Sequence, residues 1–149
     1  MREFGSEQAT RVGGLFTAVF VAEYVDAANR IGAGEDRRKA WGPGVCEGLE
    51  AAARAFADAH EADLVRWLSP GHAGYDLWMS RTGEGVGFES RYLPNDPDAI
   101  FSVYALGVRR DVAAVVEFDA AMCRLQDAAR VLGEVWVYCG DDGLLYVSQ

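Results

Sequence analysis

Three long segments of the chain repeat apolar residues every three or four positions, the spacing of one face of an α-helix. They span residues 7–30, 45–68 and 111–132. Because each such helix must bury its apolar face, the segments are predicted to pack around a shared core. The expected inward residues are Val12, Leu15, Phe16, Val19, Phe20 and Tyr24 in the first, Leu49, Ala53, Phe56, His60, Leu64 and Trp67 in the second, and Val112, Val115, Met122, Leu125, Ala129 and Leu132 in the third.

Glycine and proline mark the predicted helix ends. A glycine-rich linker over 32–44 follows the first helix, and Ser69-Pro70-Gly71 is expected to end the second. Asp111 is predicted to cap the third helix, and Gly133 is predicted to end it.

Alternating residues predict a first β-hairpin in the middle of the chain. Its arms are 75–81 and 86–92, joined by a turn at 82–85. One face pairs Met79 with Phe88 and is expected to meet the core. The opposite, polar face carries Asp76, Trp78, Arg81, Glu84, Glu89 and Arg91. It is either partly covered by a helix or loop, with its charges paired, or exposed as a recognition surface.

A second hairpin is predicted at the end of the chain. Residues 134–139 alternate, with Trp136 and Tyr138 on one face, and Gly140-Asp141-Asp142-Gly143 forms a turn before a last strand at 144–147. The predicted fold class is therefore α+β, a small antiparallel β-sheet of two hairpins packed against about three helices.

The predicted domain is a single one over residues 7–149. Residues 1–6 match the translation of common cloning sites and are expected to be a vector-derived tail. Residues 93–99 are expected to form a loop, whereas 100–108 are compatible with either a short strand or a helix.

Charge restricts the partners. With 14 Lys+Arg against 23 Asp+Glu the formal net charge is −9, so general binding to nucleic acid through phosphates is not expected. Seven carboxylates lie between Asp111 and Gln149, against Arg124 and Arg130, and this acidic segment suits a basic partner. No apolar run is long enough for a membrane span, and no signal peptide is recognised, so the cytoplasm is expected.

Patterns that would indicate a cofactor or metal are weak. Gly83, Gly85 and Gly87 precede a predicted strand rather than a helix, which favours a turn over a phosphate loop. Asp141 and Asp142 lack the further oxygen ligands of a calcium loop. The three cysteines are widely spaced, which argues against a disulfide framework or a zinc site. No cofactor and no metal site are predicted.

The stretch from Gly74 to Arg91 resembles a motif of small proteins encoded by bacteriophages and mobile elements, A-G-H-D-F-W-x-T-R-x-G-x-G-x-G-F-x-x-R. The stretch from Gly133 to Tyr146 is similar to their C-terminal G-x-V-x-x-Y-x-G-D-D-G-x-x-Y, although Tyr75 stands where these proteins usually have histidine. The resemblance implies a phage or prophage context, in which small acidic proteins often bind and block host machinery.

The expected function is that of a non-enzymatic interaction protein. It would block the basic, nucleic-acid-handling surface of a host defence system such as CRISPR–Cas or restriction, through Asp76, Trp78, Glu84, Glu89 and Arg91, with Asp141 and Asp142 as a second surface. One alternative is a small hydrolase or nucleotide-binding enzyme that uses His72, Asp76 and Glu89. Another is a homodimer with the sheet or Trp78 at its interface.

Overall fold

The computed structural model of the chain describes residues 2–82, 87–91 and 112–149. The described part contains four α-helices and one two-stranded antiparallel sheet, which agrees with an α+β class but has one hairpin where two were predicted. The elements in chain order are α1 (Arg2–Ala27), η1 (Ala28–Gly32), η2 (Gly34–Asp36), α2 (Val45–Trp67), α3 (Pro70–Arg81), η3 (Phe88–Arg91), α6 (Val112–Val131), β1 (Trp136–Cys139) and β2 (Leu145–Ser148).

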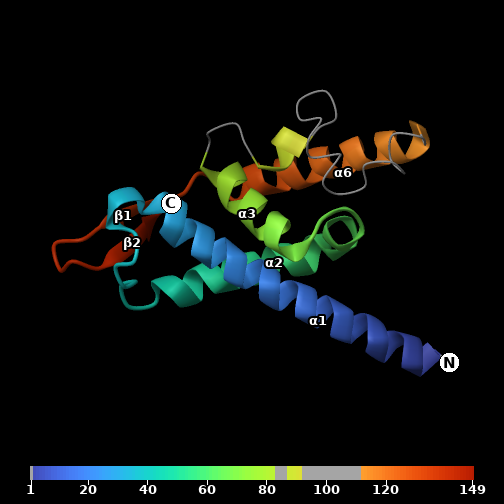
Figure 1. Cartoon of the computed structure of the whole chain (residues 1–149), viewed down its shortest axis with the longest axis horizontal. Helices are drawn as coiled ribbons and strands as arrows, with labels where there is room; N and C mark the ends of the chain where they lie inside the picture. Colours follow the sequence, from blue (N-terminus) through green and yellow to red (C-terminus); the bar gives the residue numbers. More distant parts are fainter. Residues whose placement is uncertain (1, 83–86, 92–111) are drawn as a thin grey trace.

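The helices pack around α3, which contacts α1, α2 and α6 (Figure 1). Helix α1 is the longest of the described helices and runs along the molecule from the N-terminus to the β-hairpin (Figure 1). The hairpin lies beside the C-terminal end of α1, and the C-terminus of the chain returns to this same end. The sheet is therefore an appendage at one end of a helical core and not a layer beneath the helices.

The predicted first hairpin is wrong, because residues 70–81 form helix α3 and residues 88–91 form the 3-10 turn η3. Ser69 accepts a hydrogen bond from the backbone N–H of His72, and Pro70 occupies the first helical turn. A serine cap followed by proline is typical of a helix start, whereas Ser69-Pro70-Gly71 was predicted only to end the preceding helix. Helix α3 is buried on almost all sides, so its sequence lacks an amphipathic pattern.

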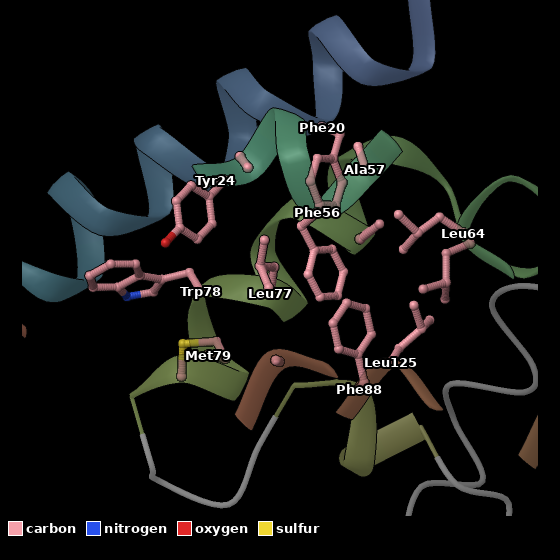
Figure 2. Close-up of a cluster of buried hydrophobic side chains, with 14 of the residues drawn as sticks. Phe20, Tyr24, Phe56, Ala57, Leu64, Leu77, Trp78, Met79, Phe88 and Leu125 are labelled. Carbon is pink, nitrogen blue, oxygen red and sulfur yellow. The ribbon is translucent and has the colours of Figure 1, made fainter. Parts of the chain in front are cut away.

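The core of the molecule is aromatic. Phe20 stacks on Phe56 at 6.3 Å between ring centroids, and Phe56 stacks on Phe88 at 6.0 Å, which joins α1, α2 and η3 (Figure 2). Tyr24 meets the edge of Trp78 at 5.8 Å. Leu15 and Val19, both expected inside, are 70% and 41% exposed, because the buried stripe of α1 is centred on Phe16, Phe20 and Tyr24.

The predicted second hairpin is confirmed. Strands β1 and β2 pair with Tyr138 opposite Tyr146 and Cys139 opposite Leu145. Gly143 has φ +78°, the left-handed conformation expected at this turn. Ala40 and Gly42 form backbone hydrogen bonds with Leu145 on the other edge of β2. The linker before α2 therefore holds the hairpin against the helices.

The three helices predicted from the apolar spacing can be compared with the structure, whereas two other predicted segments cannot. The helices predicted over 7–30, 45–68 and 111–132 are present, and α2 departs from helical geometry at His60. Most of the expected inward residues of α2 are buried, but Leu132 is 40% exposed after α6 ends. The predicted loop at 93–99 and the ambiguous segment at 100–108 lie outside the described residues.

Candidate protein-interaction site

One face of the hairpin presents aromatic side chains to solvent. Trp136 is 53% exposed and Tyr138 is 48% exposed. Tyr138 stacks on Tyr146, its partner across the strands, with 5.8 Å between ring centroids. We call Trp136, Tyr138 and Tyr146 the aromatic face. Exposed aromatic residues in a group are typical of protein interfaces, because they bury a large area with little loss of conformational entropy.

Two glycines make room for Tyr146. A Cβ atom added at Gly42 would lie 2.4 Å from the Tyr146 ring, and one added at Gly140 would lie 2.7 Å from it. The ring therefore lies over backbone from the linker and from β1's end, where a side chain would displace it. This packing fixes one of the three rings of the aromatic face before any partner binds.

The turn beside the aromatic face is acidic. The Asp142 carboxylate accepts hydrogen bonds from the Tyr146 hydroxyl and from the backbone N–H of Leu144, the latter at 3.0 Å. These bonds lower the pKa of Asp142 below its ordinary value, and the bond from the Tyr146 hydroxyl has the largest effect. The same contact raises the pKa of Tyr146. Asp142 therefore stays charged at neutral pH. Asp141 and Asp142 are both exposed, as their predicted role in partner binding requires.

The inner face of the hairpin is anchored in the core. A Cβ atom at Gly32 would lie 2.5 Å from the Trp78 ring and 2.9 Å from Val137, so these three residues are closely packed. The backbone N–H of Val135 donates to the carbonyl of Arg81 at 3.1 Å. The aromatic face is thus presented by a strand fixed to α3 and η1.

Arg81 connects this anchor to the helices. Its side chain is buried and donates to the Tyr24 hydroxyl at 2.8 Å, to the carbonyl of Leu132 at 3.1 Å and to the carbonyl of Gly133 at 3.3 Å. Burial raises the pKa of Tyr24, and the nearby Arg81 charge and its hydrogen bond partly oppose this rise. The guanidinium caps the C-terminal end of α6, where the chain turns into β1.

A polar pocket of about 310 Å³ lies between α3, η3 and the end of α6. Gln126 accepts hydrogen bonds from the Ser80 hydroxyl and from the backbone N–H of Glu89, both at 3.0 Å. The Ser80 hydroxyl accepts from Phe88 N–H at 3.1 Å. These bonds join η3 to two helices. The lining residues are Ser80, Arg81, Glu89, Gln126, Ala129, Arg130, Gly133 and Glu134.

Gly87 explains how η3 approaches α3 so closely. Its φ is +100°, and a Cβ atom there would lie 2.2 Å from the Ser80 hydroxyl oxygen and 2.6 Å from the Asp76 carbonyl oxygen. The last glycine of the G-x-G-x-G series therefore meets a steric requirement of the fold. It belongs to a helix–turn contact and not to the hairpin that was predicted.

The predicted binding surface around Trp78 is wrong, because Asp76, Trp78 and Arg81 are buried. Asp76 is 1% exposed and Trp78 is 0% exposed, since both belong to the buried helix α3. Glu89 lies at the pocket and pairs with Arg130 at 3.1 Å. Arg91 ends η3, but its side chain, like all of Glu84, lies outside the described residues.

The residues of the alternative enzyme do not meet in a pocket described here. His72 is exposed at the first turn of α3, whereas Asp76 is buried one turn further along. Glu89 lines the polar pocket at the other end of α3, and neither His72 nor Asp76 lines it. Among the described residues there is no group of three His, Cys, Asp or Glu side chains placed to hold a metal ion.

Trp136 and Tyr138 share one face of the predicted strand 134–139, but they were not among the predicted binding residues. The sequence signal was the alternation of residues 134–139, which places Val135 and Val137 on the opposite face; the structure adds that Val135 is buried. Comparison of the chain with protein-family models, with curated proteins and with solved structures finds no match. Over 2–82, 87–91 and 112–149, no helix has the length and apolar character needed to cross a membrane.

Proposed function

We propose that this chain is a non-enzymatic interaction protein that binds a basic protein partner through the aromatic face and the acidic turn beside it. The exposure of Trp136 and Tyr138 next to Asp141 and Asp142 is the observation that carries the proposal. Aromatic rings and carboxylates together attract arginine and lysine side chains, by cation–π contact and by charge.

The charge of the whole chain supports a basic partner. The net charge is −9, and the segment from Val131 to Gln149 contains three carboxylates and no lysine or arginine. Such a surface speeds association with a cationic protein and disfavours anionic ones.

The proposed biological role is the inhibition of a host defence system such as CRISPR–Cas or restriction. A protein that handles nucleic acid has a basic surface, and an acidic protein bound there excludes the phosphate backbone. The resemblance of two sequence stretches to proteins of phages and mobile elements supports this context. The host cytoplasm is the compartment in which such a target is found.

Affinity capture from a bacterial host lysate tests the proposal. The unmodified protein is compared with a variant carrying Trp136→Ala, Tyr138→Ala and Asp142→Asn. The matched control carries Leu15→Ala and Asp58→Asn, which remove exposed groups elsewhere. We expect the unmodified and control chains to retain a basic protein that added salt releases. The variant with the three substitutions, the face variant, should not retain it.

Once identified, the partner is purified and its binding to nucleic acid is measured with and without this protein. Competition between the two supports the inhibitor role. Equal capture by the face variant, or retention of acidic proteins alone, would contradict the proposed function.

A further inference from the structure

Among the described residues, the hydrogen-bond pattern of the hairpin leaves one edge of β1 without a partner strand. Gly140 N–H donates to the carbonyl of Leu144 at 2.8 Å, which makes 140 and 144 a hydrogen-bonded pair. In an antiparallel ladder such pairs alternate with non-bonded ones. Tyr138 and Trp136 therefore bond to β2, whereas Val137 and Cys139 direct their N–H and C=O groups away from it.

The outward groups of β2 confirm this alternation. Leu145, opposite Cys139, accepts from Gly42 at 2.7 Å and donates to Ala40 at 2.9 Å on the far side of β2. The linker therefore covers that edge at Leu145. On the β1 side, Val135 donates to the carbonyl of Arg81, and the described residues give no backbone hydrogen bond to Val137 or Cys139 beyond it. Within the described part of the chain, no strand pairs with the β1 edge at these two residues.

An open strand edge is a template for another strand. A strand added here would lie about 4.8 Å from β1 and would place alternate side chains beside Trp136 and Tyr138 on the aromatic face. Glu134 precedes β1, and Asp141 and Asp142 follow it, so both ends of the edge carry negative charge. A segment with arginine at alternate positions matches this arrangement, because guanidinium groups stack on aromatic rings and pair with carboxylates.

Lys39, a basic residue near β1, lies on the face of the hairpin opposite the aromatic face. Lys39 pairs with Asp36 at 2.7 Å, and its Nζ atom is 3.6 Å from the Cys139 sulfur. The Cys139 side chain is on the face of Val137, opposite Tyr138, so Lys39 does not neutralise the aromatic face.

We propose that β1 accepts an extended, arginine-containing segment of the partner as an added strand at its Val137–Cys139 edge. This inference rests on the proposed function and specifies how the partner binds. A second copy of this chain fits less well, because it would bring two acidic turns and two chains of net charge −9 together.

Amide hydrogen exchange, followed by NMR on the unmodified full chain, tests the proposal. The probe is a ten-residue peptide of alternating arginine and threonine, and the matched peptide has glutamate in place of arginine. With the arginine peptide we expect the exchange of the Val137 and Cys139 amides to slow by about tenfold or more, since each gains a hydrogen bond. The Tyr138 amide, already bonded to β2, should change little, and the glutamate peptide should have no effect.

A pair of substitutions gives a second measurement. Cys139→Pro removes the outward N–H without removing a bond to β2, whereas Cys139→Ser keeps it. We expect the proline variant to bind the arginine peptide about tenfold more weakly and the serine variant to bind as the unmodified chain does. Circular dichroism establishes that each variant is folded, and the exchange experiment needs no variant.

The outcomes separate this inference from the proposed function. Peptide binding that alters the Trp136 signals but not the exchange of Val137 and Cys139 would overturn the edge proposal and leave face binding intact. Absence of peptide binding would also overturn the edge proposal. The proposed function would still be tested separately, by the capture of a basic protein. Protection without peptide, together with a doubled mass in light scattering, would assign the edge to a second copy instead.

Discussion

Arg81 is the residue at which the helical core and the hairpin meet. Its guanidinium binds Tyr24 of α1 and the carbonyls of Leu132 and Gly133, and its own carbonyl accepts from Val135 just before β1. A buried cation with several oxygen acceptors satisfies groups that would otherwise lack partners at the end of α6. The position of the candidate binding face therefore depends on a residue that never reaches it.

Replacing Arg81 by methionine is expected to destabilise the protein substantially. The buried Tyr24 hydroxyl and two part-buried carbonyls would lose their donor. Because an unpaired buried group costs about 1–3 kcal/mol, we expect the free energy of unfolding to fall by about 2 kcal/mol or more. Urea denaturation measures it. Arg130→Met is the matched control at a side chain that is 58% exposed, and we expect it to cost less than about 1 kcal/mol. Equal losses in the two variants would show that the Arg81 hydrogen bonds do not stabilise the fold.

At the scale of elements, α3 is held against α1 at a glycine. A Cβ atom added at Gly74 would lie 2.4 Å from the backbone oxygen of Phe20 and 3.0 Å from the Tyr24 nitrogen. Backbone atoms cannot move aside as the end of a side chain can. The close crossing of these two helices thus requires the absence of a side chain at this position.

Gly74→Ala is expected to lower the free energy of unfolding by about 1–3 kcal/mol through overpacking. Gly48→Ala is the matched control, because Gly48 also lies within a helix but a Cβ atom there meets nothing within 4 Å. That variant should be more stable by up to about 1 kcal/mol, since alanine favours the helix. Thermal denaturation of both variants measures the change in stability. A Gly74→Ala variant as stable as the unmodified protein would contradict the close crossing of α1 and α3.

Helices α2 and α6 are linked by an ion pair at the surface. Arg124 donates to both oxygens of Asp63 at 2.9 Å, and this contact lowers the pKa of the Asp63 carboxyl below 3.8. Because the folded-state pKa is the lower one, the stabilisation is present above pH 3.8 and is lost as the pH falls through the folded-state value.

Asp63→Asn should therefore flatten the acid side of the stability curve. The variant is expected to lose about 0.2–1 kcal/mol near pH 7, the range for an exposed pair, and to approach the unmodified protein below the folded-state pKa. Urea denaturation at a series of pH values measures the difference. A difference that stays constant from pH 7 to pH 2 would show that the carboxylate charge is not its cause.

The elements that the sequence predicted are those with one buried face. Helices α2 and α6 and the final hairpin each have one face in the core and one in solvent. Their ends, marked by glycine, were predicted within a few residues of the observed ends. Helix α3 was missed because both its faces are buried and because Ser69-Pro70 has the composition of a terminator as well as of a start. The choice of Trp78 as a binding residue followed from that error, since a strand would have placed it on the polar face.

The candidate site was predictable in part. Asp141 and Asp142 were selected, and the alternation of 134–139 already placed Trp136 and Tyr138 together. Their exposure could not be inferred, because it depends on Val137 meeting Trp78 and Gly32, which lie far away in the sequence. Which face of a strand is covered is decided by tertiary packing.

On the scale of the whole molecule, the helical bundle supports the hairpin, and the hairpin carries the proposed interaction surface. The C-terminal segment that forms it contains Glu134, Asp141 and Asp142 and no lysine or arginine, and the net charge of the whole chain is −9. Salt at physiological concentration screens exposed charges beyond about 8 Å, so contacts at the turn should persist while long-range attraction weakens.

The most direct test of the account is the affinity of the purified protein for its captured partner, measured at low and at physiological salt. For the variant carrying Trp136→Ala and Asp142→Asn we predict an affinity lower by about thirtyfold, the loss expected for an interface anchor. For the unmodified chain we predict binding that weakens as salt rises. An unchanged affinity in the variant, or binding that is indifferent to salt, would contradict the claim that the protein acts through this face.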